Sequence, residues 1–270
     1  MVEKVLRKIK SLPPLPESVN RVRQICDDPN GTIKELVPIV KEDPMFTADI
    51  LKAANSPLYG FSRQITSIDQ AVALFGMGTI QGFAISYAIR ESFPINLSPY
   101  GVSQSQLLKV SALQNSLTLH WGKKQVATHK AEMMTTSLLM ELGKVVSSAV
   151  LEEEGKSGSF GKEIKNAKTA EEIAKVEKRF LDITSEWIAA LMFKQWKFHD
   201  AMVSMLRFIE RPEEAPENIR RHVEILSVVK EATPLLRPLS EESLQSAYEK
   251  ADSYGLEAET LHEAIEKISK

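Results

Sequence analysis

Apolar residues recur every three or four positions along most of the chain, the spacing that places them on one face of an α-helix. Between residues 134 and 150 two interleaved series predict a nearly all-round apolar helix: Met134, Leu138, Leu142, Val145 and Ala149, with Leu139, Val146 and Val150. Broad apolar faces recur over residues 187–192 and 261–268. No stretch alternates apolar and polar residues between hairpin turns, as strands do. The pattern therefore predicts an all-α, multi-helix fold.

Polar residues that begin helices support this prediction. Asp43 followed by Pro44 places a carboxylate at the cap and a proline at the first helical position, and predicts a helix through Ala54. The capping-box spacing, in which Ser or Thr precedes Glu or Gln by three positions, predicts further helix starts. It occurs at Thr32–Glu35, Ser67–Gln70 and Thr169–Glu172.

Two stretches rich in turn-forming residues divide the chain. Residues 92–101 separate the first helices from the rest, and residues 155–161 predict a loop within the later set. We therefore expect two helical subdomains, residues 1–97 and 98–270, that pack together as one unit. A groove between them is expected near residues 92–101, and partner surfaces would lie there or on exposed aromatic side chains.

The stretch from Gln70 to Ile89 has no charged residue and is long enough to span a membrane. It nevertheless contains polar side chains and several glycines, and Gly76-Met77-Gly78 is typical of a break between two helices. We therefore expect two buried helices here rather than a membrane span.

Composition narrows the functional classes. Of 270 residues, 43% are hydrophobic and 26% charged, and the net charge of −2 argues against general binding of nucleic acid. A nucleic-acid face remains an alternative at residues 162–178, but acidic residues are interleaved with the basic ones, which indicates a solvated helix. The charged N-terminus lacks the apolar stretch of a signal peptide, so the cytoplasm is the expected compartment.

Cys26 is the sole cysteine, which excludes a disulfide within the chain and a cysteine-based zinc site. Its position in a helical run predicts a half-buried core thiol. A reactive nucleophile is the alternative, although no neighbouring residue would lower the thiol pKa.

Five motifs follow one another in order in the first ninety residues: Ser11–Glu17 (SLPPLPE), Lys41–Thr47 (KEDPMFT), Leu51–Gly60 (LKAANSPLYG), Ile65–Ala71 (ITSIDQA) and Leu74–Met77 (LFGM). This succession resembles the HDOD domain, a bacterial regulatory relative of the HD phosphohydrolases. The resemblance is strong over residues 9–91 and continues more thinly to about residue 235. It implies an HD-like fold in which residues 98–270 form the HD-like helical subdomain.

The signature residues have a direct structural interpretation. Asn55 and Ser56 can bond backbone groups left free at a helix end. Glycines such as Gly60 and Gly76 suit left-handed or closely packed backbone, and Tyr59 with Phe61 would fill the seam. We expect an architectural role for the signature positions, and the alternative is that they form a ligand or partner groove. These positions are Pro14, Asp43, Pro44, Asn55, Ser56, Tyr59, Gly60 and Gly76.

The resemblance also implies where a metal would bind. HD phosphohydrolases hold divalent metals through histidines and aspartates, which here would fall near Gln114, at Met140-Glu141 and near Thr184. Methionine is a poor ligand for such ions, and one glutamate does not hold one alone. We therefore expect no metal site and no cofactor.

A literal His-Asp pair does occur at His199-Asp200, outside the matching motif. Neighbouring residues on a helix point about 100° apart, so this pair would need further ligands. His120, His129 and His222 are the candidates. The simpler interpretation is that Asp200 caps a helix running from Met202 to Ile209, and that His120, His222 and His262 are structural.

Two functions follow. The first is a non-catalytic signal-transduction module that binds a protein partner or small ligand. The resemblance implies bacterial two-component or cyclic-dinucleotide circuits, and since no receiver or cyclase domain fits within the 270 residues, such a module would act in trans. The alternative is a metal-dependent phosphohydrolase acting on nucleotides or cyclic dinucleotides.

Overall fold

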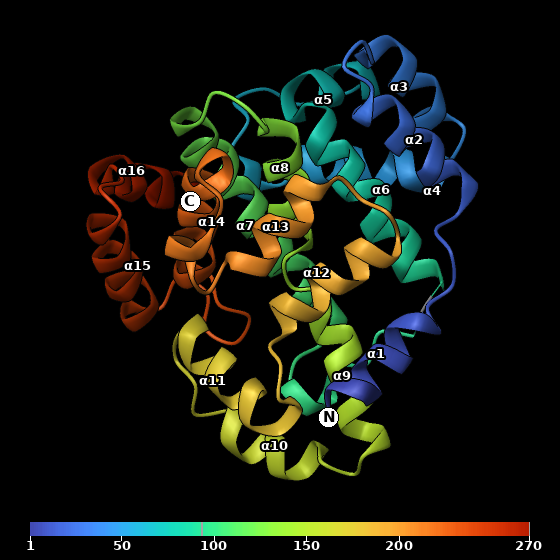
Figure 1. The fold of residues 1–270 in the computed structure, drawn as a ribbon. Helices are drawn as coiled ribbons and strands as arrows, with labels where there is room; N and C mark the ends of the chain where they lie inside the picture. Colours follow the sequence, from blue (N-terminus) through green and yellow to red (C-terminus); the bar gives the residue numbers. More distant parts are fainter. Residues whose placement is uncertain (93, 270) are drawn as a thin grey trace.

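The computed structural model describes residues 1–92 and 94–269, and every regular element within them is a helix, which confirms the all-α prediction (Figure 1). Residue 93, inside the predicted turn-rich stretch, and residue 270 lie outside the described residues. The α-helices are α1 (Val2–Lys10), α2 (Glu17–Asp27), α3 (Ile33–Lys41), α4 (Pro44–Ala54), α5 (Ile68–Phe75), α6 (Met77–Ser92), α7 (Gln104–His120), α8 (Lys130–Leu139), α9 (Gly143–Glu153), α10 (Ser157–Ile164), α11 (Ala170–Leu181), α12 (Ser185–Gln195), α13 (Asp200–Phe208), α14 (Glu217–Ala232), α15 (Glu241–Ser253) and α16 (Ala258–Ser269). Short 3₁₀ helices are η1 (Pro57–Tyr59), η2 (Ser98–Tyr100), η3 (Gly122–Gln125) and η4 (Pro212–Glu214).

Helices α2 to α6 gather at the upper right of Figure 1, and α6 joins them to the centre by packing along α8. The centre is built from α7, α8, α9, α12, α13 and α14. Helix α1 precedes α2 in the chain but packs on α9 and α12. The N-terminal segment therefore connects the group α2 to α6 with the centre of the molecule. One cluster of buried apolar side chains extends from Val5 to Ile268. The proposed division at residue 97 stays a prediction.

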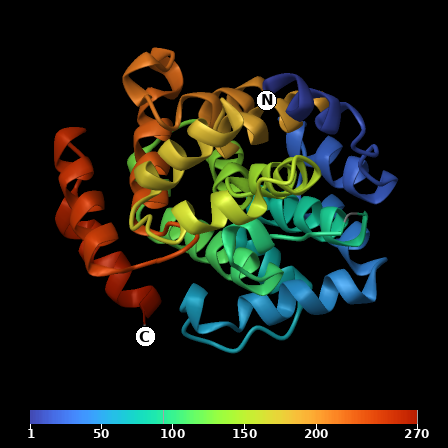
Figure 2. The same ribbon diagram turned by 90° about the horizontal axis from the view of Figure 1, so that it is seen from below.

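The last two helices form a layer at the edge of the molecule, seen apart from the remaining helices in Figure 2. Helix α15 packs on α14, and α16 packs on α7 and η1. Apolar residues at helical spacing hold α16 in place, since Leu261, Ile265 and Ile268 are all buried, as the periodicity predicts. The indole N–H of Trp121 also donates to the backbone oxygen of Glu257, at 3.1 Å.

The N-terminal motif residues fix the turns between α4 and α5. Asp43 Oδ1 accepts hydrogen bonds from the backbone N–H groups of the next turn, which confirms the predicted cap of α4. The Asn55 side chain bonds both the N–H and the C=O of Ile65, at 2.9 and 2.8 Å, and so holds the following loop against the end of α4. Ser56 Oγ accepts from the next helical turn at Leu58.

Gly60 and Gly76 have φ angles of +56° and +78°, in the left-handed region where glycine carries no steric penalty. Tyr59 is buried, and its hydroxyl donates to Asn115 Oδ1 on α7 at 3.0 Å. Pro14 is exposed in the turn between α1 and α2, where it lines a hollow together with Trp196. These contacts tie the motif-bearing helices to the rest of the fold.

Two stretches are long and apolar enough to span a membrane: Lys130–Glu153, and α5 with α6 as a pair. The apolar window of the first is 89% buried inside the fold. The pair bends by 110° at its break, next to Gly76, and α6 is largely buried. The predicted pair of buried helices is thus confirmed.

Two sequence predictions between residues 134 and 161 need correction. The apolar run over residues 134–150 is divided into α8 and α9, because bonds three residues apart tighten the backbone around Met140–Leu142. Residues 155–161 are not wholly a loop, since α10 begins at Ser157. The physical reason is the apolar pair Phe160 and Ile164, which buries one face of α10.

Candidate functional site

The positions where a metal would be expected are all buried. Gln114 is on α7, Glu141 is in the turn between α8 and α9, and Thr184 caps the start of α12. Met140 is fully buried among apolar side chains. The Gln114 amide donates to Glu141 Oε1 at 2.8 Å, so the structure brings these two together.

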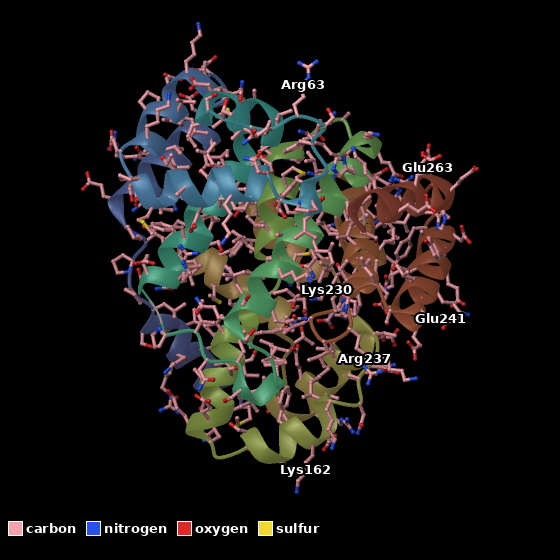
Figure 3. All side chains as sticks on the ribbon, turned by 180° about the vertical axis from the view of Figure 1, so that it is seen from behind. Arg63, Lys162, Lys230, Arg237, Glu241 and Glu263 are labelled. Atoms are coloured by element: carbon pink, nitrogen blue, oxygen red, sulfur yellow. The ribbon has the colours of Figure 1, made fainter. Side chains whose placement is uncertain are left out.

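Lysine ammonium groups contact both oxygens of Glu141. Lys144 Nζ, from α9, lies 2.7 Å from Oε2, and Lys230 Nζ, from α14, lies 2.8 Å from Oε1. The side chains of Glu141 and Lys144 are each 1% exposed and that of Lys230 is 9% exposed. Figure 3 shows Lys230 within the body of the molecule, whereas Lys162 extends outward from α10.

Two further carboxylates complete this buried ion-pair network. Glu186 Oε1, from α12, lies 2.6 Å from Lys230 Nζ and 3.3 Å from Lys144 Nζ. Glu177, from α11, lies 3.6 Å from Lys144 Nζ and accepts the hydroxyl of Tyr100 at 2.8 Å. The network therefore connects α7, α9, α11, α12 and α14 through charged and polar side chains.

A close approach of backbones makes the network possible. Gly143 begins α9, and a Cβ built on it would lie 1.7 Å from the carbonyl oxygen of Ser185. Without a side chain at this position, α9 reaches the start of α12, and Lys144 Nζ comes within 2.8 Å of Ser185 Oγ. The backbone N–H of Ser185 donates in turn to Glu177 Oε2 at 2.7 Å.

The charges of the network perturb one another strongly. Burial acts to raise the pKa of Glu141, but Lys144 and Lys230 outweigh it and lower that pKa to about 2. Burial acts to lower the pKa of Lys144, yet the surrounding glutamates raise it well above its ordinary value. For Glu177 burial prevails and raises the pKa, despite Lys144. Glu141 is thus an anion held between two cations.

These residues do not fit a divalent metal. The strongest candidate ligand is Glu141, whose two oxygens already contact ammonium groups. A metal ion placed there would meet the two positive charges of Lys144 and Lys230 at close range. The remaining groups at the family's positions are an amide at Gln114, a buried thioether at Met140 and a capping hydroxyl at Thr184, a poor donor set for such an ion.

Sequence reasoning identified Glu141 but missed its partners Lys144, Lys230, Glu177 and Glu186. One signal was available, because Lys230 interrupts the apolar run that begins at Ile225 on α14. A charged residue inside such a run is rarely buried unless it is paired. The sequence alone did not show which carboxylate it would meet.

The depressed pKa of Glu141 predicts a pH dependence of stability. A carboxylate whose folded pKa is about 2, against an ordinary value of about 4.3, stabilises the folded state at neutral pH. That contribution is complete above about pH 5.5 and is lost as the pH falls through the folded pKa. We therefore expect the difference in unfolding free energy between the native chain and Glu141→Gln to narrow steadily between about pH 5.5 and pH 2.5. Urea denaturation at several pH values measures it, and a difference independent of pH would contradict the assignment.

The prediction that Asp200 of the His199-Asp200 pair caps the following helix is wrong. His199, not Asp200, is the cap of α13, because His199 Nδ1 accepts the backbone N–H of Ala201 at 3.2 Å. Asp200 is the first residue of the helix and is exposed. With Nδ1 used as an acceptor, neutral His199 carries its proton on Nε2, which leaves no lone pair there for a metal.

Of the candidate partners, His129 lies nearest to this pair. Its ring centroid is 6.0 Å from that of His199 and 5.9 Å from that of His222, whereas His120 bonds the backbone oxygen of Tyr59 elsewhere. His129 Nδ1 contacts Glu132 at 3.0 Å. Among residues 1–92 and 94–269, no group of three or more His, Cys, Asp or Glu side chains is arranged to hold a metal.

The remaining predicted groups make local structural contacts. Cys26 is half-buried, as expected, and burial raises its thiol pKa to about 12, with a smaller contribution from Asp27. His222 is buried on α14 and contacts the backbone oxygen of Thr128 at 2.8 Å. His262 contacts the hydroxyl of Tyr248 at the surface.

A groove of about 330 Å³ lies between α4, α6 and α7. Its lining includes Arg90 and Ser105, which flank residues 92–101 in the chain, so the groove lies near the predicted place. Within that stretch, Leu97 and Tyr100 are buried in the core. The groove lies between helices of the two predicted subdomains.

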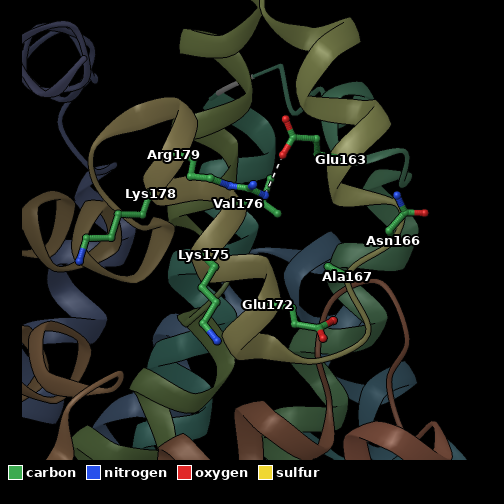
Figure 4. Close-up of a pocket in the computed structure, with 8 residues that line it drawn as sticks. All are labelled: Glu163, Asn166, Ala167, Glu172, Lys175, Val176, Lys178 and Arg179. Atoms are coloured by element: carbon green, nitrogen blue, oxygen red, sulfur yellow. Dashed lines mark ion pairs between the residues drawn. The ribbon is translucent and has the colours of Figure 1, made fainter.

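A larger and more open hollow, of about 730 Å³, lies between α10 and α11 (Figure 4). Two of its three basic side chains are paired locally: Arg179 lies 2.7 Å from Glu163, and Lys175 contacts Glu171. This arrangement is that of a solvated helix face, on which neighbouring charges of opposite sign alternate.

The chain is similar to known proteins in both sequence and fold. A family model described as the HDOD domain matches residues 12–212, about three quarters of the chain. That range includes Glu141, Lys144, Glu177 and Glu186, whereas Lys230 lies beyond it.

Several solved structures share the fold. A virulence factor from Campylobacter jejuni subsp. jejuni is 26% identical, with a TM-score of 0.57, and the alignment covers 99% of this chain and 97% of the other. A candidate signal transduction protein from Marinobacter aquaeolei is 20% identical with a TM-score of 0.67, covering 99% of this chain and 62% of the other. A candidate phosphohydrolase from Shewanella amazonensis is 20% identical with a TM-score of 0.64, covering 98% and 97%.

Among curated proteins, an uncharacterized protein of Treponema pallidum is 24% identical over 79 residues. The match covers 29% of this chain and 15% of the relative, so the chain corresponds to a small part of that protein.

Proposed function

Because the chain belongs to the HDOD domain family, we propose that it is a non-catalytic signal-transduction module of the bacterial cytoplasm, which binds a protein partner or small ligand. The observation that carries the proposal is the buried ion-pair network. Lys144 and Lys230 neutralise Glu141 at the position where a metal would be held in an HD phosphohydrolase. A chain that keeps this architecture without a metal can still bind a partner or ligand and transmit a signal.

The network also suits a module that works by binding. Its charged groups join helices α9, α11, α12 and α14, and breaking such a buried pair costs several kcal/mol. The centre is therefore expected to be rigid. Binding surfaces are expected at the periphery, and the groove between α4, α6 and α7 is one candidate.

The second candidate is a metal-dependent phosphohydrolase acting on nucleotides or cyclic dinucleotides. It is favoured by the description of the Shewanella amazonensis structure, which shares the fold at 20% identity. This function would require a metal to displace Lys144 and Lys230 from Glu141, or to bind beside His129 and His199.

A substrate screen separates the two functions. The purified chain, supplied with Mn²⁺, Mg²⁺, Fe²⁺ or Zn²⁺, is incubated with nucleoside triphosphates and cyclic dinucleotides, beside an active HD phosphohydrolase as positive control. We expect no product above the protein-free background. Metal-dependent turnover that is abolished by Glu141→Gln, or by the double change His199→Ala and Asp200→Ala, would overturn the non-catalytic proposal.

A further inference from the structure

The groove between α4, α6 and α7 has an apolar lining drawn from three helices. Phe46 and Ala53 belong to α4, Phe83 and Tyr87 to α6, and Leu108 and Ala112 to α7. All but Phe46 are partly exposed, so the groove keeps apolar surface in contact with solvent. Its volume of about 330 Å³ lies at the lower end of the range for small-molecule sites, roughly 300–1,000 Å³.

The charged residues of the groove are not balanced. Three basic side chains line it, Lys52, Arg90 and Lys109, against the single carboxylate of Asp49. Arg90 is paired with Asp49 at 2.6 Å and lies over the ring of Tyr87. Across the described part of the chain, neither Lys52 nor Lys109 has an ion-pair or side-chain hydrogen-bond partner. Two positive charges therefore remain beside an apolar surface.

The position of these lysines indicates where a negative group would lie. On the Tyr87 side of the groove, Arg90 lies over the Tyr87 ring and is paired with Asp49, so a positive and a negative charge already offset each other there. Lys52 on α4 and Lys109 on α7 carry no such neighbouring acid in an ion pair. An anionic group is therefore favoured beside these lysines, with an apolar body along Phe83 and Ala112.

We propose that this groove binds a small amphiphilic anion, an apolar body of small-molecule size that carries one carboxylate or phosphate group. The inference rests on the proposed function as a binding module and names the class of ligand. The site lies between the two predicted subdomains, because α4 and α6 belong to the first and α7 to the second. Leu138 of α8, also in the second, lines it as well. Leu138 is three residues from Glu141, so a bound ligand touches the helix that leads to the buried network.

Isothermal titration calorimetry with chemically matched probes tests the proposal. Decanoate and decyl phosphate supply the same apolar body with either anionic group, and decyltrimethylammonium supplies that body with a positive charge. We expect saturable binding of one anion per chain, for at least one of the two anions. The cation is expected to bind at least about tenfold more weakly, because the lysine charges that attract an anion repel a cation.

Variants locate the binding in the groove. Lys109→Glu is at an exposed position and should weaken anion binding by about tenfold without affecting the fold. Ala112→Trp should abolish binding by filling the groove. Lys34→Glu, an exposed lysine of α3 outside the groove, is the matched control and should bind normally.

Three results would overturn the proposal: no binding of either anion, equal binding of the cation, or unchanged binding by folded Lys109→Glu. None of these results involves metal or hydrolysis. Failure of the ligand assignment is therefore distinguishable from failure of the non-catalytic function, which the substrate screen reports.

Discussion

Replacing Lys144 with methionine is expected to lower the free energy of unfolding by about 3–5 kcal/mol, the cost of leaving buried charges without their partner. Lys144 Nζ contacts Glu141, Glu186 and Ser185, and its side chain is 1% exposed. Methionine retains much of the apolar stem but none of the charge, so the loss reflects the electrostatics of the network. Urea denaturation followed by circular dichroism measures it.

Lys175→Met is the matched control, because Lys175 pairs with Glu171 on the surface, where the two side chains are 68% and 62% exposed. An exposed pair of this kind contributes about 0.5 kcal/mol or less. Equal effects of Lys144→Met and Lys175→Met would show that the buried network does not stabilise the fold. If Lys144→Met does not fold, Lys230→Met, at the less buried end of the network, gives the same comparison.

Gly143→Ala is the second change with a large expected effect, a loss of about 3 kcal/mol or more. A Cβ at this position would lie 1.7 Å from the Ser185 carbonyl oxygen and 2.9 Å from the backbone nitrogen of Ala189. Because the obstructing atoms are backbone, α9 and α12 must move apart to relieve the overlap. The thermal unfolding midpoint should fall accordingly.

Gly158→Ala provides the control for this change. Gly158 lies within α10, and a Cβ there meets no atom within 4 Å. Alanine in an open helical position stabilises by roughly 0.4–1 kcal/mol, chiefly by restricting the unfolded chain. The two Gly→Ala changes should therefore have opposite signs. A loss for Gly143→Ala no larger than about 0.5 kcal/mol would contradict the close approach of α9 to α12.

Much of the fold could be predicted because its signals are local. The cap at Asp43, the break at Gly76 and the apolar face of α16 each depend on residues within a few positions of one another. The errors were local too. The stretch after Gly155 contains turn-forming residues, but burial of Phe160 and Ile164 outweighs them and stabilises α10.

The centre of the molecule could be predicted only in part. The resemblance implied that Gln114 and Glu141 lie near each other, and the structure brings them within hydrogen-bond distance. The pairing of Glu141 with Lys230 joins residues 89 positions apart, and neither periodicity nor capping carries information about it. The same holds for the groove, whose lining depends on how α4, α6 and α7 pack.

The metal content of the purified chain tests most directly whether lysine ammonium groups occupy the place of a metal. The chain is produced in medium supplemented with manganese, iron and zinc, and its metals are measured by mass spectrometry, beside those of Glu141→Gln. We predict far less than one metal ion per chain in both proteins. Finding about one or more metal ions per native chain, and none in Glu141→Gln, would contradict the assignment of Lys144 and Lys230 as the cations that neutralise this centre.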